Sequence, residues 1–253
     1  MVLDGADPAR AVDLPARFTA DRNRHLAVVG AGVAEAVPIL QWSTLGLTFQ
    51  LDPAKTSFTV LDLLRDDDED AIPSGVVAAT TAELSRLGHD CTVIGPQDAA
   101  ATIMSHHASL DEASAAGTAR YIVGFGMDRA PRMNQELEGE SKFSRTTPMD
   151  SLRALLADGA INGTHVLGWW TTLDAFSEQV ARAVSSVGML AFLKVPQRES
   201  RSVIPAAPDW EHTRNRALWF DRDHWTTPTP FVPYAVADAA DLESFLATEA
   251  VTR

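Results

Sequence analysis

The chain has 253 residues, of which 45% are hydrophobic and 22% charged, so it is long enough for one large domain or two small ones. A net charge of −13 argues against tight, unaided binding to a nucleic-acid backbone, because such affinity comes mainly from Lys and Arg. The single Cys91 excludes an internal disulfide and a four-cysteine zinc site. The start of the chain lacks a signal-peptide pattern, and no apolar run approaches the ~20 residues that span a bilayer. We expect a cytoplasmic protein.

In chain order, apolar runs typical of strands alternate with stretches typical of helices, after a polar lead-in segment over residues 1–24. Strands are predicted over residues 26–29, 58–63, 91–94, 120–125, 163–170, 189–194, 216–221 and 230–234. Helices are predicted over residues 34–50, 78–87, 99–116, 148–156, 173–184 and 238–251, with an exposed loop over residues 129–147. The alternation predicts an α/β fold: a mainly parallel sheet flanked by helices, with two closing antiparallel strands. We expect residues 1–253 to form one domain, with any ligand at the carboxyl ends of the parallel strands.

The first long strand runs into Gly30-Ala31-Gly32 and then into a helix, which is the strand–glycine loop–helix order of a nucleotide site. In a working phosphate-binding loop, a Lys that neutralises phosphates and a Ser or Thr that holds Mg²⁺ follow the second glycine. Here the residues after Gly32 are Val33, Ala34, Glu35 and Ala36. They supply no cation and no hydroxyl, and Glu35 would repel phosphate. The order of elements is that of an ATPase, but the residues that bind phosphate and Mg²⁺ are missing from the loop.

Four segments, within roughly residues 10–236, resemble the RecA-like P-loop motor domain of FtsK/SpoIIIE-type DNA translocases. The first is Leu26 to Gly32 with its following helix, and the second is Phe58 to Asp62. The third, the most specific, is the run from Leu152 to Gly159 that leads into Asn162-Gly163-Thr164-His165-Val166-Leu167. The fourth is Arg216 to Asp221 followed by Pro230 to Tyr234. The resemblance implies a RecA-like fold, binding of ATP and Mg²⁺, ring-like oligomers or sibling ATPase modules as partners, and DNA contact through the assembly.

The catalytic positions implied by this resemblance have changed together. The Lys and hydroxyl of the Walker A loop fall at Glu35 and Ala36, Asp128 is the one acid after the strand that carries Walker B, and Thr171 stands at the sensor position. Asp62 ends the second strand, where it could face Mg²⁺. Losing a single charge-stabilising group usually costs on the order of 10²–10³ in rate, so we expect a silent module. We therefore predict no catalytic residue with confidence, no resident metal ion and at most weak nucleotide binding.

Three other hypotheses stay open at this point. One is an active motor domain in which Asp62 or Asp128 holds Mg²⁺ and a neighbouring subunit supplies the cation. Another is a protein-interaction module that binds no nucleotide. The third is a dinucleotide site at Gly30-Ala31-Gly32, although the third glycine of that motif is replaced by Glu35, and Asp62 lies farther on than the ~20 residues expected.

Several residues have an ordinary structural interpretation. The acidic run at residues 65–70 and the arginines Arg129, Arg132 and Arg145 are expected to be solvated loops. His165 is expected to be a hydrogen-bonded core histidine, and His106 and His107 point in different directions on a helix and cannot grip one metal ion. Trp169 and Trp170 alternate across a strand, so one is expected in the core and the other on a sheet surface or against a partner.

Overall fold

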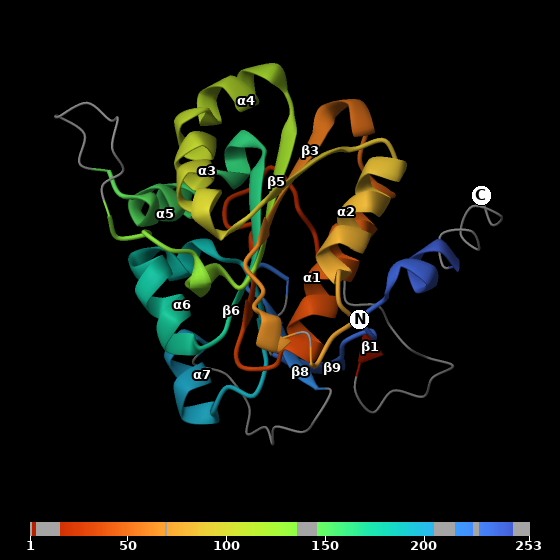
Figure 1. Ribbon diagram of the computed structural model, residues 1–253. Helices are drawn as coiled ribbons and strands as arrows, with labels where there is room; N and C mark the ends of the chain where they lie inside the picture. The colour runs from red at the N-terminus through yellow and green to blue at the C-terminus, as the bar shows by residue number, and fades with distance from the viewer. Residues whose placement is uncertain are drawn as a thin grey trace.

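The predicted α/β architecture is confirmed by a computed structural model, which describes residues 2–3, 16–68, 70–135, 146–204, 216–224 and 228–244 (Figure 1). Within these ranges one sheet has the strand order β1-β9-β8-β7-β2-β6-β5-β3-β4. The strands are β1 (Val2–Leu3), β2 (Leu26–Val29), β3 (Thr56–Asp62), β4 (Asp90–Ile94), β5 (Ala119–Phe125), β6 (Thr164–Trp170), β7 (Met189–Phe192), β8 (Ala217–Asp221) and β9 (Thr229–Val232). The strands from β7 to β4 run parallel, and β8, β9 and β1 close the sheet in antiparallel pairs.

The helices lie close to the predicted positions, with two differences. They are α1 (Val33–Thr48), α2 (Val76–Arg86), α3 (Pro96–Ala108), α4 (Leu110–Ala116), α5 (Pro148–Asp158), α6 (Leu173–Val180) and α7 (Gln197–Val203). The predicted helix over residues 99–116 is interrupted at Ser109, and α7 was not predicted. Residues 239–244 are helical, while the rest of the predicted last helix lies outside the described residues, as do residues 136–145 of the predicted loop. None of the described helices is long and apolar enough to span a membrane.

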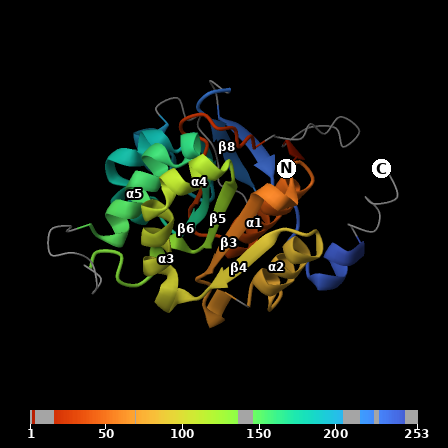
Figure 2. The same cartoon turned by 90° about the horizontal axis from the view of Figure 1, so that it is seen from above.

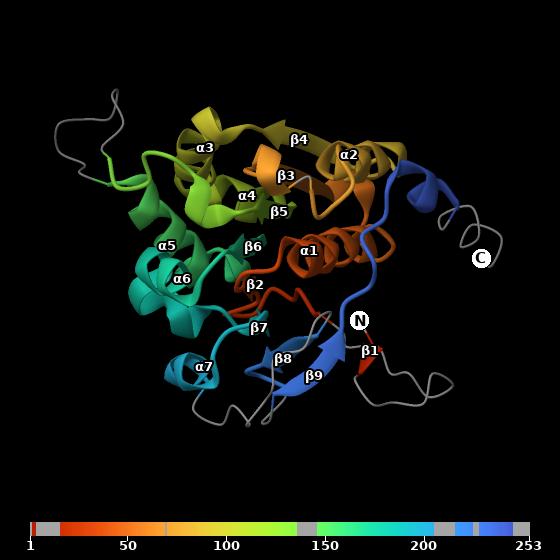
Figure 3. The ribbon, with the colours of Figure 1, turned by 60° about the horizontal axis from the view of Figure 1, so that its bottom comes forward.

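Helices cover both faces of the sheet. Figure 2 shows α1 and α2 on one face and α3, α4 and α5 on the other, and Figure 3 shows the same division from below. Each face buries its own hydrophobic layer, so successive residues of a central strand enter opposite layers. Trp170 packs in the layer of α5 and α6, and Trp169 in that of α1 and α2. The expectation that one of them reaches a surface is wrong, because both are fully buried.

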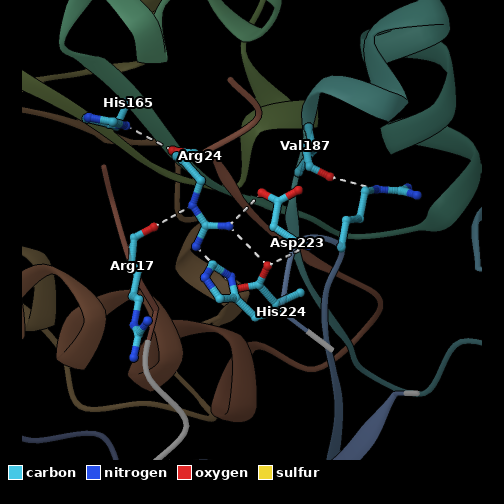
Figure 4. A network of polar contacts seen from close by, with 8 residues as sticks. Arg17, Arg24, His165, Val187, Asp223 and His224 are labelled. Carbon is cyan, nitrogen blue, oxygen red and sulfur yellow. Dashed lines mark hydrogen bonds and ion pairs between the residues drawn. The ribbon is translucent and has the colours of Figure 1, made fainter. Parts of the chain in front are cut away.

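A buried ion pair joins the chain before β2 to the end of β8, at the amino ends of the parallel strands (Figure 4). The guanidinium of Arg24 donates to both carboxylate oxygens of Asp221, at 3.0 and 3.1 Å, and to Asp223 at 3.0 Å. Its Nε donates to the carbonyl of Arg17 at 2.7 Å. Burial alone would raise the pKa of Asp221, but the hydrogen bond and charge of Arg24 hold that pKa below its ordinary value. The pair ties the antiparallel end of the sheet to its centre.

His165 is a buried core histidine, as predicted. Its Nδ1 lies 2.9 Å from the carbonyl oxygen of Arg24, and its ring stacks on Tyr121 with centroids 5.1 Å apart. His25 on the neighbouring segment accepts a hydrogen bond at Nδ1 from the backbone N–H of Val166, at 3.0 Å. Burial lowers the pKa of His25 to about 3 and that of His165 to about 4. Both side chains are therefore neutral in the folded chain at neutral pH.

Acid should destabilise the fold through these two histidines. Below their ordinary pKa of about 6.5 both protonate in the unfolded chain and stay neutral in the folded one, so the unfolded state binds more protons. The stability they contribute is full above pH 6.5 and is lost as the pH falls. We expect the free energy of unfolding to decrease by up to about 1.4 kcal/mol per pH unit for each histidine between about pH 6.5 and 4.

Urea unfolding followed by tryptophan fluorescence at several pH values measures this slope. Asparagine can reproduce the Nδ1 hydrogen bond of either histidine without titrating, so the slope should be shallower in His165→Asn and shallower still in the variant that combines it with His25→Asn. A combined variant with the slope of the unmodified chain would contradict the prediction. Burial also lowers the pKa of His106 to about 4, so a slope of similar size to that of His165 remains in every variant.

Candidate functional site

The sheet topology places the predicted site residues along one edge. Strands β2, β6 and β5 are parallel neighbours, so the residues after their carboxyl ends lie side by side. The glycine loop follows β2, Thr171 follows β6, and Asp128 follows β5 in a 3₁₀ turn over Met127–Arg129. The structure therefore brings together three of the four predicted elements.

The glycine loop is held tightly against β6 and β7. The N–H of Gly30 donates to the carbonyl of Trp170 at 2.9 Å, and the indole N–H of Trp169 donates to the carbonyl of Gly30 at 3.0 Å. Gly30 has a φ of 125°, and a side chain there would place Cβ 1.7 Å from the carbonyl oxygen of Leu193. This glycine is required by close packing of the chain whether or not a ligand binds.

The side chain of Glu35, a residue of the first turn of α1, folds back to the start of that helix. Gly32 is the N-cap residue, and the N–H groups of Glu35 and Ala36 donate to its carbonyl at 3.1 and 2.8 Å. The side chain of Glu35 is 6% exposed and returns toward Gly32, where a Cβ would meet its Oε2 at 2.7 Å. The carboxylate thus supplies the negative charge that a helix N-terminus favours and that a bound phosphate would otherwise bring.

Lys194, which follows β7, completes this arrangement. Its Nζ lies 3.3 Å from Oε1 of Glu35, and the backbone of Lys194 has a φ of 52°, unusual for a residue with a side chain. Sequence reasoning missed Lys194. The signal was a single cation at the end of an apolar strand, but its meaning depends on β7 lying next to β2, which the sequence did not reveal.

Asp128 and Thr171 are joined by two hydrogen bonds. The backbone N–H of Thr171 donates to Oδ1 of Asp128 at 3.0 Å, and the Thr171 hydroxyl donates to Oδ2. The preceding turn is held by Gln179, whose amide donates to the carbonyl of Met127 at 3.2 Å. Both carboxylate oxygens of the one predicted Walker B acid accept a hydrogen bond from Thr171, so the orientation of this carboxylate is fixed within the chain.

Arg129 is not the solvated residue that was expected. Its guanidinium makes two hydrogen bonds to the carboxylate of Asp68 and lies 4.9 Å from the ring centroid of Trp169. Asp68 itself is buried, so the acidic run is only partly a solvated loop. Arg129 therefore fixes the loop after β3 to the sheet edge rather than reaching toward a neighbouring subunit. Arg132 lies in the described part of the following segment, and Arg145 lies outside the described residues.

Asp62 does not join the glycine loop. It ends β3, three strand positions from β2, a separation of roughly 14 Å across the sheet. Burial raises the pKa of its carboxyl, and the side chain lines a separate pocket of about 400 Å³ between the N-termini of α2 and α3. Among the residues that the structure describes, no group of three His, Cys, Asp or Glu side chains could hold a metal ion.

No protein-family model and no curated protein sequence matches the chain. Solved structures do. The cytoplasmic domain of the type VII secretion ATPase EccC from Thermomonospora curvata is 13% identical with a TM-score of 0.58, over 90% of this chain and 25% of EccC. EssC (ATPases 2 and 3) from Geobacillus thermodenitrificans is 10% identical with a TM-score of 0.56, over 89% and 42%. The genome packaging NTPase B204 of Sulfolobus turreted icosahedral virus 2, in complex with AMPPCP, is 8% identical with a TM-score of 0.51, over 85% and 99%.

These likenesses confirm the predicted fold: the chain has the fold of RecA-like P-loop ATPase domains. At such low identities they concern the fold and leave the activity to be argued from the site. The chain spans about a quarter of the EccC cytoplasmic domain and less than half of EssC.

Proposed function

We propose that the chain is an FtsK/SpoIIIE-like ATPase-fold module with degenerate Walker motifs that neither binds nor hydrolyses ATP effectively. The observation that carries the proposal is the Glu35–Lys194 pair. A buried carboxylate occupies the start of α1, where phosphate would bind, and the nearby cation is already engaged with it. The engaged oxygens of Asp128 and the distance of Asp62 from the glycine loop add support, since the rival motor hypothesis needs one of them for Mg²⁺.

In this proposal the module serves as a structural, regulatory or partner-binding part of a larger cytoplasmic ATPase that translocates DNA, secretes proteins or acts in defence. The EssC structure contains its ATPases 2 and 3, and the chain covers less than half of it. This favours a role beside sibling ATPase modules or further copies of the chain. Hydrolysis would then come from a sibling, and DNA contact from the assembly, because the chain itself carries a net charge of −13.

Calorimetric titration with Mg²⁺ and AMPPCP tests the proposal. We expect no saturable binding up to millimolar nucleotide and no ATP turnover, because the Lys194 ammonium and the Thr171 hydroxyl, the nearby groups in the described ranges, are engaged with Glu35 and Asp128. Lys194→Met is the matched variant, and it should leave this result unchanged. Micromolar binding that Lys194→Met abolishes would show that Lys194 acts as a displaced phosphate-binding lysine, and the proposal would then fail. ATP turnover by an assembled ring would also refute it.

A further inference from the structure

β4 is the outermost strand of the sheet, and its outer edge has no strand partner among the described residues (Figure 3). Strands of a parallel sheet are usually buried on both faces, yet three of the five residues of β4 are exposed. Val93 is 48% exposed, one of the few large hydrophobic residues so exposed in the described chain. β4 contains no Lys, Pro or bulge of the kind that protects an edge from pairing. The edge is open to a further strand.

The 400 Å³ pocket at the carboxyl end of β4 gives this edge a second feature. Val93, Ile72 and Val76 form apolar parts of its lining, while Asp62 and Asp66 place two carboxylates in the same lining. Among the described residues, Arg65 is the one cation in this lining, and the exposed Asp67 and Asp70 lie on the same loop. An apolar hollow with an acidic rim is suited to an apolar side chain flanked by basic ones.

The negative charge of the chain indicates which kind of segment could bind at the β4 edge. A second copy would bring another net charge of −13 to an acidic edge, which opposes self-pairing. A basic segment of a different protein would be attracted instead. Strand addition to an open edge gains main-chain hydrogen bonds, and a side-chain pocket beside the edge gives specificity.

We propose that the β4 edge and the adjoining pocket bind an extended, basic segment of a partner protein. The segment adds as a strand beside β4, places a branched apolar side chain against Val93, and sets Lys or Arg against Asp62 and Asp66. This rests on the partner-binding part of the proposed function. It is independent of the nucleotide question, because the pocket and the glycine loop are separate, so either proposal can fail alone.

The test uses a fluorescein-labelled peptide of alternating lysine and valine, titrated with the full chain at about 0.15 M salt, where exposed charges more than about 8 Å apart are largely screened. Fluorescence anisotropy should show saturable binding. Val93→Lys should weaken it about tenfold, because a charge replaces the apolar contact and repels the peptide. Ile161→Lys is the matched control: Ile161 is 40% exposed but precedes the central strand β6, at the amino ends of the parallel strands, and this variant should bind normally. Both side chains are exposed, so both variants should fold, as thermal unfolding can verify.

Three results would overturn the proposal. One is equal weakening by Val93→Lys and Ile161→Lys, which would indicate general attraction of a basic peptide to an acidic protein. Another is equal binding of a glutamate–valine peptide. The last is a concentration-dependent dimer in sedimentation that Val93→Lys abolishes, which would make a second copy the occupant.

Discussion

Replacing Arg24 with methionine should lower the free energy of unfolding by about 3–5 kcal/mol, the usual cost of breaking a buried ion pair. The substitution removes the guanidinium partner of a carboxylate that is only 2% exposed and leaves Asp221 with the N–H of Asp223 and the ring of His224. It also removes the hydrogen bonds that join the segment before β2 to Asp223 and to the carbonyl of Arg17. Methionine fills similar space, so the loss reports the charge more than a cavity.

Urea denaturation at neutral pH measures this effect. Combining Arg24→Met with Asp221→Leu should recover much of the lost stability, because well-packed apolar residues often replace a buried pair at little cost. Arg86→Met is the surface control: its partner is Glu83, the Arg86 side chain is 55% exposed, and the change should be about 0.5 kcal/mol or less. A loss below about 1 kcal/mol in Arg24→Met would contradict the prediction.

Gly30→Ala should abolish folding or cost more than about 3 kcal/mol. The new Cβ would lie 1.7 Å from the backbone oxygen of Leu193, at a φ of 125° that disfavours any side chain, so the loop after β2 would have to leave β7. The expected failure is structural and independent of nucleotide. It would show that packing alone requires a glycine at this position.

Gly46→Ala provides the matched control in the helix that follows. No other atom lies within 4 Å of a Cβ at Gly46, and alanine is more stable than glycine in a helix interior. The free energy of unfolding of this variant should therefore rise by about 0.5–1 kcal/mol. Circular dichroism and thermal melting of the two variants give the comparison. A Gly30→Ala variant with the same melting temperature as the unmodified protein would contradict the prediction, because the loop could then shift without loss of stability.

The fold was largely predictable because the central strands contain short apolar runs, such as Leu26–Val29, that glycine or a polar segment ends. The errors have physical causes. The predicted helix over 99–116 is Ala-rich throughout, and its interruption at Ser109, whose hydroxyl donates to the carbonyl of Ser105, leaves little trace in the pattern. Helix α7 has a polar sequence without apolar spacing. Trp169 and Trp170 were separated into core and surface, although a strand covered by helices on both faces buries both.

The candidate site was predictable only in part. Its residues follow successive parallel strands, so the meeting of Gly30, Asp128 and Thr171 could be anticipated from the resemblance. The contacts that decide its chemistry join distant parts of the chain. Lys194 reaches Glu35, and Arg129 joins Asp68 beneath Trp169, and neither pairing can be read without the strand order and the helix positions.

The Glu35–Lys194 pair also constrains how the loop could change by mutation. Glu35→Lys, the single substitution toward a phosphate-binding loop, would place two ammonium groups together at a helix N-terminus that already disfavours cations. Removing Lys194 first would take away the ammonium group that lies 3.3 Å from the buried carboxylate of Glu35. Each first step is unfavourable, and only the joint replacement avoids the penalty. The two positions should therefore behave as an epistatic unit, in which a lysine at position 35 is tolerated only together with a change at position 194.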